Sequence, residues 1–161
     1  MLTRGLVLIS VLTLGACGGT DPTGIYQVTA HTISEDCATT QSVSEPPYIR
    51  IVEQSFFGAE FYTTEYCETD DVATCTAEGG LFGEEGDDFG GYISSASGGS
   101  TSCSLNYISY KVTLDGDVLT YTTEVHGETV MGIACTAEEA TSRGNDMPCE
   151  SREVITASRV K

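Results

Sequence analysis

The chain has 161 residues, 24 of them Asp or Glu and 7 of them Lys or Arg, so its formal net charge is −17. This length is typical of a single domain. Nucleic acid and anionic lipid surfaces repel a polyanion, so the charge argues against both as partners.

The first 16 residues have the pattern of a secretory signal peptide. Arg4 precedes a mostly apolar run from Gly5 to Ala16. This run of 12 residues is shorter than the roughly 20 that a membrane-spanning helix needs. A short basic start, an apolar middle and small residues before a cleavage point are typical of an exported protein.

The end of this segment, Leu14-Gly15-Ala16-Cys17, resembles the lipobox of bacterial lipoproteins. The resemblance implies that residues 1–16 are removed and that Cys17 becomes the acylated N-terminus. Because Gly18 rather than Asp follows the cysteine, it also implies lipid anchorage in the outer membrane of the cell envelope. Several acyl chains hold a protein firmly on a membrane, whereas one alone is marginal.

The predicted organisation after cleavage is a short tether over residues 17–23 and one all-β domain over residues 24–161. In this mature chain, Leu, Ile, Val and Phe make up 27 of 145 residues. Their share is just under the roughly 20% below which a highly charged chain tends to stay disordered. Another source of stability is therefore expected.

The six cysteines other than Cys17 are expected to supply the additional stability. An even number of cysteines in an exported chain indicates a disulfide framework, here of three bridges. Short separations favour bridges 67–75 and 135–149, which leaves 37–103, although six cysteines allow many pairings. A zinc site is the alternative, but no C-x-x-C pair occurs. The residues predicted to form bridges are Cys37, Cys67, Cys75, Cys103, Cys135 and Cys149.

Alternation of apolar and polar residues predicts strands along most of the domain. In the first of these, Tyr26, Val28 and Ala30 share one face, and His31 lies on the other. Residues 78–102 contain 8 of the 16 mature glycines and are predicted to be the least ordered part. The predicted strands are 25–33, 48–53, 57–66, 81–82, 92–93, 108–114, 119–125 and 154–160, with 130–133 continuing the sheet.

Local signals predict one turn and one helix. Asp115-Gly116-Asp117 predicts a hairpin turn between the strands that flank it. Residues 137–142 are predicted to form one or two helical turns that are capped by Thr136.

Because strands and helices do not alternate, a parallel α/β sheet is not expected. The prediction is an all-β fold: an antiparallel up-and-down meander of about eight strands, stapled by disulfides and closed as a barrel, with a sandwich as the alternative. The Gly24-Ile25-Tyr26 opening, the meander and the terminal strand resemble a lipocalin-like barrel. That resemblance implies a binder of a small apolar or aromatic ligand.

The chain carries no familiar catalytic motif: it lacks the G-x-S-x-G, H-E-x-x-H and P-loop patterns. His31 and His126 are interpreted as exposed strand residues rather than as catalytic bases. The sequence therefore predicts no enzyme activity and no cofactor.

Two sets of residues are candidates for binding. The acidic run around Gly86 is interpreted as a solvated acidic loop and no metal site is predicted; a calcium site is the weaker candidate, because the D-x-[DN]-x-[DN]-G spacing is missing. Aromatic side chains with one polar tip suit the wall of a ligand cavity, and they also suit half-buried positions in a sheet. The calcium candidates are Glu84, Glu85, Asp87 and Asp88, and the cavity candidates are Tyr26, Tyr62, Tyr107, Tyr110 and Tyr121.

Ser95-Ala96-Ser97-Gly98 resembles a fragment of the loop that is used by lipoprotein inhibitors of lysozyme. The resemblance implies a basic hydrolase as partner. Independently of this motif, an acidic surface attracts basic proteins, and salt weakens that attraction. The leading hypothesis is a non-enzymatic interaction protein on the outer membrane, the alternative is a lipocalin-like ligand binder, and an inhibitor of a basic hydrolase such as lysozyme is the third.

Overall fold

The computed structural model describes residues 21–85, 88–99 and 101–160. The segment that resembles a lipobox, most of the predicted tether and Asp87 therefore lie outside the described residues. The described chain contains nine strands, one α-helix and two 3-10 helices. The elements are β1 (Gly24–Ser34), β2 (Gln41–Ser42), β3 (Tyr48–Phe56), β4 (Ala59–Cys67), η1 (Val72–Thr74), β5 (Cys75–Glu85), β6 (Asp88–Gly99), β7 (Ser102–Asp115), β8 (Val118–Val130), α1 (Ala137–Arg143), η2 (Gly144–Asp146) and β9 (Cys149–Arg159).

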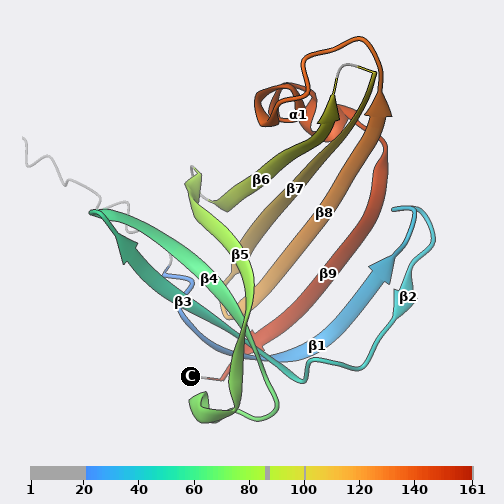
Figure 1. The fold of residues 1–161 in the computed structure, drawn as a ribbon. Coiled ribbons are helices and arrows are strands. Elements are labelled where there is room, and N and C mark those ends of the chain that lie inside the picture. The colour runs from blue at the N-terminus through green and yellow to red at the C-terminus, as the bar shows by residue number, and fades with distance from the viewer. Residues whose placement is uncertain (1–20, 86–87, 100, 161) are drawn as a thin grey trace, which may run out of the picture.

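Eight of the described strands pair in a closed antiparallel ring (Figure 1). From β3 to β9 each strand pairs with the next one along the chain, and β1 pairs with β3 on one side and with β9 on the other. The short β2 pairs only with the second half of β1. The predicted antiparallel up-and-down meander is confirmed, and closed pairing is what a barrel requires of its strands.

The ring is uneven along its axis. β7 pairs with both β6 and β8 over most of its length, whereas β5 and β6 pair only through Gly83–Glu85 and Asp88–Gly90. β6 to β9 therefore form a long curved sheet, which Figure 1 shows extending beyond the β3–β5 side towards α1.

Alternate side chains of the strands fill the interior of the ring. Phe82 of β5 lies at the centre, with its ring 5.8 Å from Tyr62 and 6.4 Å from Tyr121. Gly80 permits this packing, because a Cβ there would lie 2.8 Å from the Tyr121 hydroxyl and its φ is +73°. The buried core consists of Tyr26, Ile49, Ile51, Phe82, Phe89, Val112, Leu119, Tyr121, Ile155 and Ala157.

A second cluster lies on the outer face of β6 to β8 and is covered by α1. Cys103 and Leu105 of β7 pack there against Ala140 and Met147. The helix begins as predicted, since the Thr136 side chain accepts a hydrogen bond of 3.2 Å from the Glu139 backbone N–H. The long sheet therefore buries apolar side chains on its inner face within the ring and on its outer face near α1.

Residues 78–102, predicted to be the least ordered part with only short strands at 81–82 and 92–93, contain two long strands. β5 and β6 occupy most of this range, and β6 pairs with β7 from Phe89 to Gly99. The glycines and serines fit a strand here because a long neighbour supplies the backbone partners, and that neighbour is not visible in the local pattern. The expected continuation of the sheet over residues 130–133 is not observed, because β8 ends at Val130.

The predicted face of His31 is also wrong. A β-bulge shifts the register between Val28 and Ala30, so one extra residue enters β1 before His31. His31 consequently lies opposite Ile155, a core residue, and is only 7% exposed.

One of the three expected disulfide pairings is confirmed, Cys67–Cys75. The other two are exchanged: Cys37 pairs with Cys149, and Cys103 pairs with Cys135. Closure of the ring explains this exchange. Cys37 follows the end of β1 and Cys149 begins β9, which are neighbours in the ring, while the segment before α1 returns to the outer face of β7.

Candidate functional site: an acidic cleft lined by prolines

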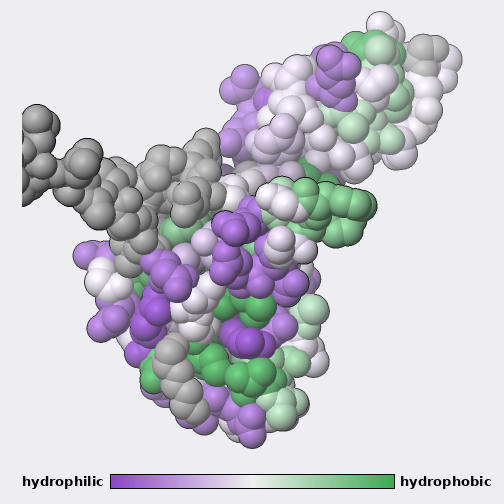
Figure 2. Space-filling view, turned by 90° about the vertical axis from the view of Figure 1, so that its left-hand side faces the viewer, coloured by the Kyte–Doolittle hydropathy of each residue, from purple (hydrophilic) through white to green (hydrophobic). Residues whose placement is uncertain are grey.

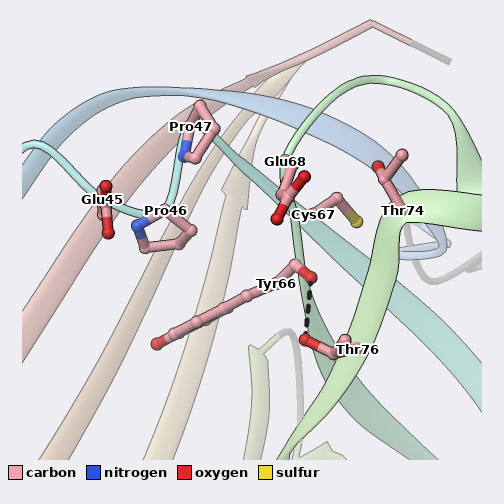
Figure 3. Close-up of a pocket in the computed structure, with 8 residues that line it drawn as sticks. All are labelled: Glu45, Pro46, Pro47, Tyr66, Cys67, Glu68, Thr74 and Thr76. Atoms are coloured by element: carbon pink, nitrogen blue, oxygen red, sulfur yellow. Dashed lines mark hydrogen bonds between the residues drawn. The ribbon is translucent and has the colours of Figure 1, made fainter.

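A cleft of about 560 Å³ opens between the loop before β3 and the β4–β5 turn (Figure 3). The Tyr66 side chain extends from β4 towards Glu45 and Pro46, and Thr74 and Thr76 lie on the opposite side. The cleft is lined by Glu45, Pro46, Pro47, Tyr66, Cys67, Glu68, Thr74 and Thr76.

The β4–β5 wall is braced by local bonds. The Cys67–Cys75 bridge joins the last residue of β4 to the first residue of β5. Between them, the Asp71 side chain caps η1 by accepting a 3.0 Å hydrogen bond from the Ala73 backbone N–H. The Thr74 hydroxyl donates to the Asp71 carbonyl at 2.8 Å. This wall is therefore fixed before any ligand arrives.

The opposite wall is held by backbone bonds to β1. The Val28 backbone N–H donates to the Pro47 carbonyl at 2.9 Å, and the Val43 N–H donates to the His31 carbonyl at 3.0 Å. The His31 side chain adds a hydrogen bond from Nδ1 to the Glu45 carbonyl. Buried His31 thus positions the loop that carries Glu45 and the buried Pro46.

A chain of hydrogen bonds connects the two walls. Nε2 of His31 lies 2.8 Å from Oε1 of Glu153 on β9, and the Tyr66 hydroxyl donates to the same oxygen at 3.1 Å. Both ring nitrogens of His31 therefore have a polar partner, the Glu45 carbonyl at Nδ1 and the Glu153 carboxylate at Nε2. The arrangement brings together three strands that are far apart in sequence.

The Tyr66 hydroxyl is a hydrogen-bond donor in this chain of bonds. Burial, followed by the charge of Glu153, raises the pKa of Tyr66 above its ordinary value, so the phenol stays protonated and acts as a donor at neutral pH. His31 links this donor to the loop before β3, because its two ring nitrogens bond to Glu153 and to the Glu45 carbonyl.

The cleft has an apolar floor and an acidic rim. Here the apolar floor means the lining side chains of Pro46, Pro47 and Tyr66, and the acidic rim means the exposed lining residues Glu45 and Glu68. Such a surface suits a lysine or arginine side chain, whose aliphatic stem packs on the floor while its charge meets the carboxylates.

A second groove of about 780 Å³ crosses the outer face of β6 to β9. The rings of Tyr92 and Tyr107 stack there at 5.3 Å, and Nε of Arg152 lies 3.1 Å from Oε1 of Glu124. His126 lies behind Glu124 and is 6% exposed, contrary to the expectation of an exposed histidine, because the segment around Met147 covers it. Both basic and acidic side chains line this groove, namely Lys111, Arg152 and Glu124, so its lining does not favour a ligand of one charge.

The predicted tyrosines do not line one cavity. Tyr26 and Tyr121 are buried in the core, and Tyr62 and Tyr110 pack against it. Tyr107 belongs to the opposite face of the sheet. The tyrosine that does line the first cleft, Tyr66, was not among the candidates, and its position beside Cys67 in a short disulfide loop is the signal that points to it.

The remaining candidates lie elsewhere. The range 95–98, which resembles part of an inhibitor loop, falls within β6 and pairs with β7. For the acidic run, β5 and β6 place the backbones of Glu84, Glu85 and Asp88, and nothing is described of their side chains. Among the side chains that are described, no group of three or more His, Cys, Asp or Glu is arranged to hold a metal ion.

No helix within the described ranges is long and apolar enough to cross a membrane. Comparison of the chain with protein-family models, with curated proteins and with solved structures gave no significant match.

Proposed function

We propose that this chain is an exported, non-enzymatic interaction protein, anchored to the bacterial outer membrane through lipid on Cys17, that binds a basic segment of another protein. The observation that carries the proposal is the cleft itself, which combines an apolar floor of proline and tyrosine with two exposed acidic residues. A lysine or arginine of the partner would enter this cleft.

The charge of the whole chain favours the same class of partner. A formal charge of −17 attracts basic proteins over a distance and raises the rate at which they meet the cleft. Such steering is weakened by salt, since the Debye length is only about 8 Å at physiological ionic strength. The proposal requires no cofactor.

The interior of the ring does not favour the alternative of a lipocalin-like ligand binder. Large side chains such as Phe82 and Tyr121 occupy the centre, where that function needs a cavity. Binding at the cleft, in contrast, needs only surfaces that are already formed.

The proposal is tested with lysozyme as a basic probe and the double variant Glu45→Gln/Glu68→Gln. Each exposed ion pair contributes roughly 0.2–1 kcal/mol, so the double variant is expected to bind about fivefold more weakly at low salt. The measurement is titration calorimetry at two salt concentrations.

The matched control is Glu60→Gln/Glu138→Gln, which removes the same charge from two exposed positions outside the cleft. We expect this control to bind almost as tightly as the unchanged protein. Equal weakening of lysozyme binding in both double variants would show that the attraction is spread over the surface, which would contradict binding at the cleft. If lysozyme bound neither the unchanged protein nor either variant, a basic partner of this kind would be contradicted.

A further inference from the structure

The turn between β3 and β4 presents two phenylalanines to solvent. Phe56 is 66% exposed and Phe57 is 95% exposed, and their rings meet edge to face at 4.4 Å. In Figure 1 this turn projects furthest to the left, and Figure 2, seen from that side, shows a hydrophobic protrusion at the same height. The pair is an apolar knob that the core does not use.

The backbone of this turn makes the choice of phenylalanine unusual. Phe56 pairs with Ala59, and the two residues between them have φ values of +51° at Phe57 and +82° at Gly58. Turns of this kind favour Asn, Asp or Gly at the first central position, because bulky side chains are disfavoured in left-handed backbone. An aromatic ring is nevertheless placed at the outermost point of the hairpin.

The chain enters the domain on the same side. Gly24, the first residue of β1, lies opposite Ile51 of β3, five residues before Phe56. Arg159 fixes the entering segment by donating to the carbonyls of Thr23 at 2.8 Å and Asp21 at 2.7 Å. In Figure 1 the start of β1 and the β3–β4 turn both lie to the left of the long sheet.

The distance from this point to the proposed anchor is short. Asp21 lies four positions after Cys17, and a fully extended chain over four positions spans at most roughly 14 Å. A lipid on Cys17 would therefore hold this side of the domain close to the membrane surface.

We propose that Phe56 and Phe57 insert into the interfacial layer of the leaflet that holds the lipid of Cys17, so that the domain rests on the membrane at two points. This inference depends on the lipid anchorage proposed above. Aromatic rings are favoured at the level of the lipid headgroups. Glu53 and Glu60 are exposed beside the turn, so the surface that fits is a zwitterionic one, whose ammonium groups complement carboxylates, rather than an anionic one.

The chain contains no tryptophan, so Phe57→Trp creates a single fluorescent reporter at the turn. The acylated protein carrying this change is reconstituted into vesicles of phosphatidylethanolamine and phosphatidylcholine that contain lipids with brominated acyl chains. Insertion predicts a blue shift of the emission and strong quenching by the brominated lipids. The matched control is Met131→Trp, at a residue that is 78% exposed beyond the end of β8, and we expect its emission to be unshifted and unquenched.

Three results would overturn the inference. If the Phe57→Trp variant binds vesicles but its tryptophan emission is neither shifted nor quenched, the anchor is retained and insertion of the turn is refuted. A blue shift that appears without lipid and grows with protein concentration would identify a second copy of the chain as the occupant. Failure of the acylated protein to associate with vesicles would refute both the anchorage and the inference that depends on it.

Discussion

Replacing Cys37 and Cys149 by serine is expected to lower the free energy of unfolding by about 5 kcal/mol. This bridge closes a loop of 112 residues and ties the end of β1 to the start of β9. A longer loop restricts the unfolded chain more, so the loss is expected to be roughly 4 kcal/mol for Cys103–Cys135 and roughly 2.5 kcal/mol for Cys67–Cys75. Since domains are stable by only about 5–15 kcal/mol, the first loss removes much of the total.

Urea unfolding of the three paired serine variants measures this order directly. The Cys67–Cys75 variant serves as the control, because it removes the same two sulfur atoms from a loop with a separation of only 8 residues. Equal losses in all three variants, or the largest loss at Cys67–Cys75, would contradict the account in which long-range closure by disulfides stabilises a core poor in apolar residues.

The protein is also expected to lose stability steeply above pH 10. Burial raises the pKa of Tyr26 to about 12 and raises the pKa values of Tyr66, Tyr110 and Tyr121 above their ordinary value. The folded protein therefore keeps these protons at a pH where the unfolded chain releases them. The stabilisation is complete below pH 10 and disappears as the pH rises through the folded-state values, at about 1.4 kcal/mol per pH unit for each such proton.

Urea unfolding at a series of pH values, started by rapid mixing so that the disulfides survive, tests this slope. Tyr121→Phe keeps the buried ring and removes one of the four protons, so its stability is expected to fall less steeply with pH than that of the unchanged protein. An unfolding free energy that stays constant between pH 10 and pH 12 would contradict the burial of these hydroxyls.

Elements with local signals were predictable from the sequence. The β7–β8 hairpin follows from alternation on both sides of Gly116, whose φ is +60°, and α1 follows from its Thr136 cap. Both depend on residues within a few positions of one another, where propensity and turn chemistry decide the structure.

Features that depend on ring closure were not predictable in the same way. β6 is ordered by its pairing with β7, and Cys37 meets Cys149 because β1 and β9 become neighbours. The bulge near Thr29 reversed the face of His31, because one added residue moves all later side chains of a strand to the other side.

The candidate site was not predictable from the sequence, because closure of the ring brings together residues that are far apart in the chain. The Tyr66 hydroxyl and Glu153 are 87 residues apart in sequence, and His31 and Glu153 are 122 apart. The sequence did indicate the excess of acidic side chains, because charge is additive along the chain. It did not indicate which carboxylates line one cleft with apolar residues, since that requires the fold to bring the loop before β3 next to the β4–β5 turn.

The central claim is that the mature protein begins with an acylated cysteine and is oxidised outside the cytoplasm, and mass spectrometry tests it most directly. The protein is extracted from bacterial membranes and digested without reduction. We expect an acylated N-terminal peptide that begins at Cys17, bridges joining Cys37 to Cys149, Cys67 to Cys75 and Cys103 to Cys135, and no free thiol. Retention of residues 1–16, an unmodified Cys17 or a free thiol in the mature chain would contradict the account.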